Sequence, residues 1–95
     1  MEEQKGSKDK YTIELSVNAQ LFLRKLDKVT KDRIEIKLKT LSTIPIPSNS
    51  KFIGRMKGEK IFRLRICIYR ILYTVKVKER IILVAKIDKR SKIYL

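Results

Sequence analysis

A strict alternation of apolar and polar residues marks the second half of the chain. Two runs, residues 61–67 and 70–77, each place an apolar side chain at every second position. Such alternation predicts β-strands that bury one face and expose the other. On the polar face the two strands together carry three guanidinium groups, those of Arg63, Arg65 and Arg70. Because like charges repel one another, this gathering calls for a functional explanation.

A helical periodicity precedes these strands and predicts a cover for their apolar face. Ser16 is a candidate N-cap for a helix that begins near Val17, and Thr30 is one for a second helix that ends near Thr43. Residues 27–29 form the short break between the two helices. Apolar residues recur at helical spacing in both segments: Ala19, Phe22, Leu23, Leu26, Ile34, Leu38 and Leu41. We therefore predict a helical hairpin that packs on the sheet.

The remaining segments complete an α+β architecture. Residues 11–15 alternate weakly and residues 80–87 continue the apolar pattern, so each is a candidate strand, whereas residues 51–58 read as irregular. The expected order is β-α-α-β-β-β, with the N-terminal helical hairpin packed on an antiparallel sheet. The polar segment 1–10 is expected to be a disordered tail, and residues 11–95 are expected to form a single domain.

Charge gives the first indication of function. The 95 residues carry a formal net charge of +14, and residues 51–95 contribute +11 of it, with 14 Lys/Arg against 3 Asp/Glu. Such an excess points to a polyanionic partner. The single cysteine excludes an intramolecular disulfide and fits a reducing cytoplasm. No apolar run approaches the ~18 residues of a membrane span, so we expect a cytoplasmic protein without a membrane partner.

The residue types present narrow the possible chemistry. Without histidine, mechanisms based on His are excluded, and the scattered carboxylates do not favour a two-metal nuclease. Arginines that clamp a phosphate, together with a tyrosine such as Tyr94, form a minimal ribonuclease that needs no metal or other cofactor. From composition alone, a basic sheet face that binds polyanions without cutting them is the simpler interpretation.

The motifs of this half resemble a known family. The segments G-E-K-I-F-R-L-R-I-C-I-Y-R-I-L-Y-T-V and I-D-K-R-S-K-I-Y are similar to those of the RelE/ParE superfamily of toxin–antitoxin toxins. The resemblance covers about residues 11–95 and implies a microbial RNase-like fold. It also implies a RelE-type endoribonuclease that cleaves mRNA in the ribosomal A site and is neutralised by a cognate antitoxin protein in a hetero-oligomer.

Family roles map onto five residues of this sequence. The resemblance implies that Arg63, Arg65 and Arg70 hold the scissile phosphate and that Arg90 assists the leaving group or the phosphate. Tyr94 would orient or deprotonate the 2′-hydroxyl. Contacts to RNA and the ribosome are expected from further basic residues: Lys51, Arg55, Lys57, Lys60, Lys89 and Lys92.

Departures from the family pattern keep other interpretations open. Cys67-Ile68 replaces a Gly-Asp turn, and Lys89 stands where the family has histidine. Because arginine rarely releases its proton, proton transfer falls to Tyr94 or to a lysine such as Lys57 or Lys60. Cys67 is expected to be a small half-buried filler, and two tyrosines, Tyr69 and Tyr73, are expected in the core. The alternatives are a ParE-like toxin that inhibits DNA gyrase, and a catalytically degenerate member that binds RNA or a protein.

Overall fold

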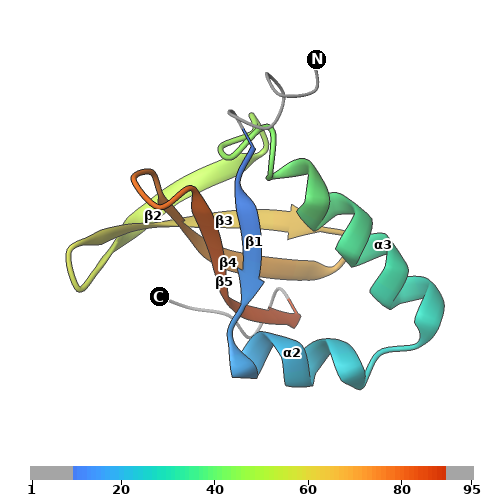
Figure 1. Cartoon of the computed structure of the whole chain (residues 1–95). Helices are drawn as coiled ribbons and strands as arrows, with labels where there is room; N and C mark the ends of the chain where they lie inside the picture. Colours follow the sequence, from blue (N-terminus) through green and yellow to red (C-terminus); the bar gives the residue numbers. More distant parts are fainter. Residues whose placement is uncertain (1–9, 90–95) are drawn as a thin grey trace, which may run out of the picture.

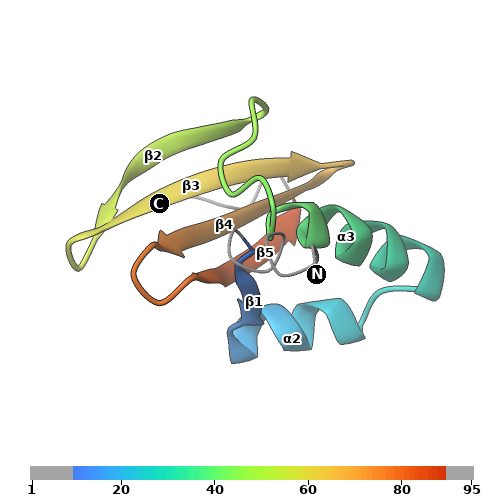
Figure 2. The ribbon, with the colours of Figure 1, turned by 45° about the horizontal axis from the view of Figure 1, so that its top comes forward.

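The structure is a computed structural model that describes residues 10–89. Its element order is β1 (Thr12–Leu15), α2 (Val17–Arg24), α3 (Lys28–Thr40), β2 (Ser50–Met56), β3 (Glu59–Ile66), β4 (Tyr69–Lys76) and β5 (Ile81–Lys89). The strands form one sheet in the order β1-β5-β4-β3-β2 (Figure 1). The two helices lie on one face of this sheet, and Figure 2 shows the opposite face without a helix among the described residues.

The predicted α+β class and the helical hairpin are confirmed, but the sheet is larger than expected. Residues 51–58, expected to be irregular, belong to β2 and to the turn that joins β2 to β3. Lys57 and Gly58 both have positive φ, 53° and 85°, as a two-residue type I′ hairpin turn requires. The sheet is also mixed rather than wholly antiparallel, because β1 pairs with β5 in parallel.

The core lies between the helices and the inner face of the sheet. Side chains from α2 and α3 meet alternate residues of β3, β4 and β5 there, including Ala19, Leu23, Ile34, Leu38, Leu64, Ile71, Tyr73, Ile82 and Val84. Tyr73 is fully buried and Tyr69 nearly so, which confirms the expectation that both belong to the core. A second, smaller apolar cluster lies on the outer face, where Ile61 and Leu72 are buried and Ile53 packs against them.

Ser16 joins the first helix to the sheet, as its predicted role as an N-cap requires. Its Oγ accepts a hydrogen bond from the backbone N–H of Ala19 at 3.1 Å and donates one to the carbonyl of Ala85 at 2.8 Å. Ala85 is skipped in the pairing of β4 with β5, where the register shifts between Leu72 and Tyr73. The same hydroxyl thus caps α2 and satisfies a carbonyl at a β-bulge.

The cap of the second helix differs from the prediction. Asp27, rather than Thr30, is the N-cap of α3, and its Oδ2 accepts a hydrogen bond from the Thr30 backbone N–H at 3.1 Å. Hydrogen bonding with Thr30 lowers the pKa of the Asp27 carboxyl. The expected break at 27–29 is therefore shorter, because Lys28 and Val29 already lie in the helix. The Asp27 carboxylate accepts a hydrogen bond from a backbone N–H of the first turn, which has no partner within the helix. Its negative charge also interacts favourably with the positive end of the helix dipole.

The turn between β3 and β4 consists of Cys67 and Ile68. Cys67 has a φ of 57°, and the residues on either side, Ile66 and Tyr69, are the last register pair of the hairpin. Contrary to expectation, Cys67 is exposed rather than half-buried, and the neighbouring Ile68 is 56% exposed. A left-handed residue at the first position of a two-residue turn normally is glycine, so this turn tolerates backbone strain at Cys67.

No helix within residues 10–89 is long and apolar enough to cross a membrane. The predicted disordered tail, residues 1–10, lies almost entirely outside the described residues. Three residues of the predicted site also lie outside them: Arg90, Lys92 and Tyr94.

Candidate nucleic-acid interface

Strand register gathers four cationic side chains on the outer face of the sheet. Lys51 of β2 lies opposite Arg63 of β3, and Arg65 of β3 lies opposite Arg70 of β4. Arg63 and Arg65 are two residues apart on one strand, so all four side chains leave the same face. We call Lys51, Arg63, Arg65 and Arg70 the basic cluster. Phe62 and Leu64, which alternate with these arginines, pack in the core beneath the helices, so the basic cluster lies on the opposite face.

The basic cluster borders an open cavity of about 360 Å³. Its described lining consists of Asn49, Lys51, Arg63 and Arg65, with no carboxylate among these four residues. Arg63 is half-buried and Arg65 is exposed. Arginine can pack the aliphatic part of its side chain on the protein and keep its charged group in solvent. A cavity with three cations and an amide suits a phosphate, because guanidinium groups donate paired hydrogen bonds to phosphate oxygens.

A second cavity continues the basic surface toward the helices. It measures about 300 Å³ and lies between α3, the 47–49 loop and the end of β3, with Arg33, Lys37 and Cys67 in its lining. Asn49 and Arg65 line both cavities, so the two are neighbours. Arg33 Nη1 lies 3.8 Å from the Cys67 sulfur. We call the two cavities together the basic track, which leads from the sheet face to α3.

A carboxylate borders the basic cluster on its far side. Asp88 of β5 lies opposite Arg70 in the register, and its Oδ1 accepts a hydrogen bond from the backbone N–H of Lys89 at 2.8 Å. Lys86, two residues earlier on the same strand, lies opposite Leu72. The outer face thus carries one acidic side chain beside five basic ones along these register pairs, and its local charge remains strongly positive.

The structure separates the other predicted contact residues from this cluster. Arg55 and Lys60 are cross-strand partners at the far end of the β2–β3 hairpin, and Lys57 lies in its turn. Arg55 and Lys60 line a different pocket. Lys89 lies opposite Tyr69 at the end of β5, so the register directs it to the other face. Lys51 is therefore the described lysine of the predicted set that the fold brings beside the arginines.

Sequence reasoning missed three residues of the basic track: Arg33, Lys37 and Asn49. Arg33 and Lys37 are four residues apart, which places them on one face of α3. That spacing was visible in the sequence, but the approach of α3 to the end of β3 was not. Among residues 10–89, no group of three or more His, Cys, Asp or Glu side chains could hold a metal ion.

Comparison with known proteins identifies the family. No family profile matches the chain. A Methanocaldococcus jannaschii protein named "Putative toxin RelE1" is 31% identical over 86 residues, which cover 90% of this chain and 96% of that protein. This chain belongs to the RelE family of toxins. The RelE assignment predicted from the strand and C-terminal motifs is thereby confirmed.

Solved structures with the RelE fold agree. The archaeal RelE–RelB complex from Pyrococcus horikoshii OT3 contains a chain similar to this one, with a TM-score of 0.77 and 21% identity, covering 88% of this chain and 99% of that chain. The isolated E. coli RelE toxin gives a TM-score of 0.66 and 24% identity, covering 83% of each chain. At these identities the structural likeness establishes the fold, two helices on a five-stranded mixed sheet.

Proposed function

We propose that this protein is the toxin of a toxin–antitoxin system and that its basic cluster binds and cleaves messenger RNA on the ribosome. The observation that carries the proposal is the convergence of Arg63, Arg65 and Arg70 from two adjacent strands on one open face. Membership of the RelE family supports the same class of function. A phosphate would accept paired hydrogen bonds from guanidinium groups gathered in this way.

The proposed reaction is an internal transesterification. The 2′-hydroxyl oxygen of one nucleotide attacks the adjacent phosphorus, the bond to the 5′-oxygen of the next nucleotide breaks, and a 2′,3′-cyclic phosphate forms. One proton leaves the 2′-hydroxyl and one joins the departing 5′-oxygen. The arginines would stabilise the extra negative charge on the phosphorane oxygens, a role that suits a group which keeps its own proton. This route requires no metal ion.

Proton transfer is assigned to two kinds of residue. Tyr94 and Arg90 keep the roles that the family resemblance implies, as part of the proposal. Among lysines, Lys51 replaces Lys57 and Lys60 as the better candidate, because it lies opposite Arg63 and lines the same cavity.

An antitoxin protein is the proposed partner beside RNA and the ribosome. The Pyrococcus horikoshii and E. coli RelE proteins have been solved in complexes with RelB antitoxins. We propose an equivalent cytoplasmic hetero-oligomer for this chain. Its charge of +14 favours an acidic antitoxin.

Two other functions compete with this proposal. A ParE-like toxin would act on DNA gyrase and would have no need for a phosphate clamp on the outer face. A degenerate member would bind RNA or a protein without cleaving the RNA. The open cavity beside Arg63 and Arg65 favours RNA binding over the gyrase alternative. Cleavage of RNA then distinguishes the proposed ribonuclease from a degenerate member that only binds.

An induction experiment in bacterial cells distinguishes the three. Expression of the wild-type chain should stop incorporation of labelled methionine within minutes and should produce mRNA fragments, while plasmid supercoiling stays normal. Loss of supercoiling with intact mRNA would support the gyrase alternative. Arrest of translation without mRNA fragments would support a non-cleaving binder. The variant Arg63→Ala/Arg70→Ala, expressed to the same level, serves as the inactive control.

A further inference from the structure

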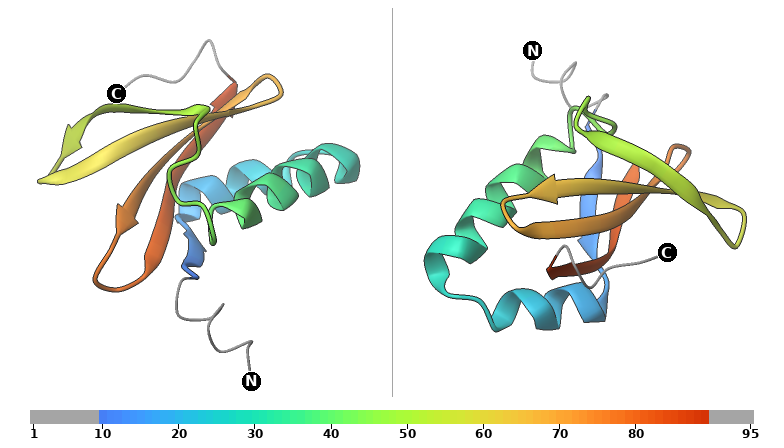
Figure 3. Two further views of the ribbon diagram at one scale, coloured as in Figure 1. Left: turned by 90° about the horizontal axis from the view of Figure 1, so that it is seen from above. Right: turned by 180° about the vertical axis from the view of Figure 1, so that it is seen from behind.

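The two hairpins of the sheet separate at one end and leave a fork between them. Pairing of β3 with β4 ends at Phe62 and Tyr73, yet β3 begins three residues earlier and β4 continues three residues further. Figures 2 and 3 show the β2–β3 hairpin diverging from the β4–β5 hairpin beyond this point. We call the space between residues 59–61 and 74–76 the fork. Neither segment pairs with the other, so each presents backbone edge groups toward it.

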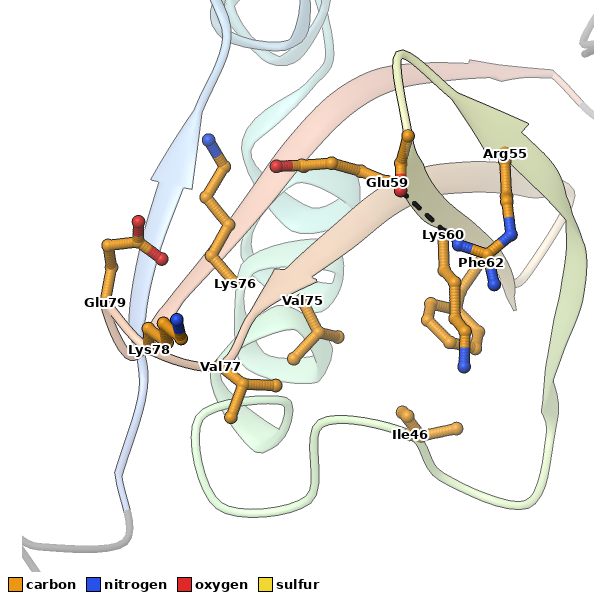
Figure 4. Close-up of a pocket in the computed structure, with 11 residues that line it drawn as sticks. Ile46, Arg55, Glu59, Lys60, Phe62, Val75, Lys76, Val77, Lys78 and Glu79 are labelled. Atoms are coloured by element: carbon orange, nitrogen blue, oxygen red, sulfur yellow. Dashed lines mark hydrogen bonds between the residues drawn. The ribbon is translucent and has the colours of Figure 1, made fainter.

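An apolar pocket of about 410 Å³ lies at the base of the fork. Figure 4 shows the side chains of Phe62, Val75 and Val77 arranged around the space opposite Ile46. Val77 is 65% exposed and Ile46 is 54% exposed, although both are apolar. Isolated exposed apolar residues are common, but a group of them lining one concavity marks a binding surface.

The floor of the pocket is preformed. The Phe62 ring stacks on Tyr73 with centroids 5.7 Å apart and meets Phe52 edge-on at 6.0 Å. The Tyr73 hydroxyl donates a hydrogen bond to the Pro45 carbonyl at 2.8 Å, which holds the loop that carries Ile46 against the sheet. A pocket held by ring contacts and a partly buried hydrogen bond loses little conformational entropy when it is filled.

Charged side chains surround this apolar floor. Four described cations, Arg55, Lys60, Lys76 and Lys78, outnumber the two carboxylates, Glu59 and Glu79. Arg55 Nη1 donates to the Gly58 carbonyl at 3.4 Å, drawn as the dashed line in Figure 4. The rim therefore favours acidic side chains, while the floor favours apolar ones.

The fork pocket and the basic cluster lie on opposite faces of the sheet. Phe62 and Arg63 are consecutive residues of β3, so their side chains leave opposite faces. A molecule in the pocket would not need to cover Arg63 or Arg65. The two faces of this protein are thus available to two different ligands, a polyanion on the outer face and another partner in the fork.

We propose that the fork binds an extended segment of a partner protein in which apolar residues alternate with Asp or Glu. The segment would add hydrogen bonds to an unpaired strand edge, place apolar side chains on Phe62, Val75 and Val77, and direct carboxylates to the cationic rim. The inference rests on the proposed function only for the identity of the partner, which would then be the antitoxin. The site itself rests on the geometry of the fork.

Peptide titration of the full chain tests the proposal. The probe is an acetylated, amidated heptapeptide, Glu-Val-Glu-Val-Glu-Val-Glu, added to the ¹⁵N-labelled protein at about 150 mM salt. We expect amide shifts to concentrate at residues 46, 59–62 and 74–78. A peptide with Lys in place of Glu should produce no such shifts. Shifts spread over the basic cluster, or an absence of binding, would overturn the proposal.

A pair of matched variants separates the pocket from general charge attraction. Val77→Asp places a carboxylate on the pocket floor, whereas Ile36→Asp makes the same change at a residue of α3 that is 63% exposed. We expect Val77→Asp to weaken peptide binding about tenfold and Ile36→Asp to change it less than about twofold. Equal weakening in both variants would contradict the pocket.

RNA cleavage measured on the same samples distinguishes this inference from the proposed function. Val77→Asp should cleave mRNA as the wild type does, because the substitution lies on the other face. Peptide binding at the fork without cleavage would reject only the proposed function. Cleavage without peptide binding would reject only the fork site.

Discussion

Arg65 lies directly opposite Arg70 in the antiparallel pairing of β3 with β4. Opposed residues in such a pair have Cβ atoms about 4.5–5.5 Å apart, so like charges there destabilise the sheet. Arg63 adds a third guanidinium group on the same face. We therefore expect the charge of Arg65 beside Arg70 to cost some stability, which a bound polyanion would recover.

Removal of one charge from this pair should improve stability and harm RNA binding. We expect Arg65→Gln to raise the free energy of unfolding by about 0.5 kcal/mol in urea titrations at low salt, because one of two opposed like charges is removed. The same variant should bind a non-cleavable 2′-O-methyl RNA at least about tenfold more weakly. Lys78→Gln, which removes one charge in the β4–β5 turn, is the control for net charge. Equal RNA affinity in the two variants would argue against the basic cluster.

The track beside α3 should contribute to affinity without contributing to chemistry. We expect Arg33→Ala/Lys37→Ala to weaken RNA binding and to reduce the slope of log affinity against log salt by about 1 to 2, because phosphate contacts release counterions. Single-turnover cleavage at saturating protein should be unchanged. Arg24→Ala/Lys25→Ala at the end of α2 provides a matched loss of two charges. A cleavage defect at saturation would place Arg33 or Lys37 in the reaction instead.

The β3–β4 turn should be stabilised by restoring glycine. Cys67 has a φ of 57°, a conformation that glycine adopts without steric cost. We expect Cys67→Gly to raise the free energy of unfolding by about 0.5–1 kcal/mol, which corresponds to a few degrees in Tm. Ile68→Gly is the matched control, because Ile68 does not have a positive φ. A stability gain in Ile68→Gly and none in Cys67→Gly would show that strain at Cys67 is unimportant.

Tyr73 should make stability fall at alkaline pH. Burial raises the pKa of the Tyr73 phenol, and a hydrogen bond with Ser50 opposes this in part. Because the pKa of this phenol is higher in the folded than in the unfolded protein, folding favours its neutral form. The neutral phenol therefore makes its full contribution to the free energy of unfolding below the unfolded pKa of about 10, and this contribution is lost as the pH rises through the folded pKa. Tyr73→Phe should cost about 1 kcal/mol near neutral pH, because the bond to Pro45 is lost.

The cost of Tyr73→Phe should then shrink above about pH 10, because the wild type must bury a charge or unfold. Urea titrations of the wild type and of Tyr73→Phe across this pH range give the difference between their free energies of unfolding. The many lysines titrate alike in both proteins, so their effect cancels in this difference. A difference that stays constant with pH would contradict the proposed coupling between Tyr73 ionisation and unfolding.

Alternation of residue types was sufficient to predict the two central strands and the arginines on their outer face. It failed for β2, because a register shift between Phe52 and Gly54 interrupts the alternation there. The turn Lys57-Gly58 was a usable indication of a hairpin at that point. Cys67 was misplaced because period-two counting continues through a turn, where side chains no longer alternate between faces.

The contacts between distant segments could not be predicted in the same way. Arg33 and Lys37 join the basic track only because α3 packs beside the end of β3, and no local pattern encodes that packing. The division of the predicted basic residues between two faces depends on the bulge in β2. The fork depends on where β3 and β4 stop pairing, which alternation does not specify because both strands continue beyond that point.

Cleavage of ribosome-bound mRNA tests the central claim most directly. Purified protein is added to an in-vitro translation system with one defined mRNA, and the products are mapped by primer extension. The wild type should cut the mRNA only when ribosomes engage it and should leave 2′,3′-cyclic phosphate ends. A 2′-deoxy substitution at the cut position, or Arg65→Ala/Arg70→Ala in the protein, should abolish the cut. Unbroken mRNA with wild-type protein, or unchanged cleavage by the double variant, would contradict the account.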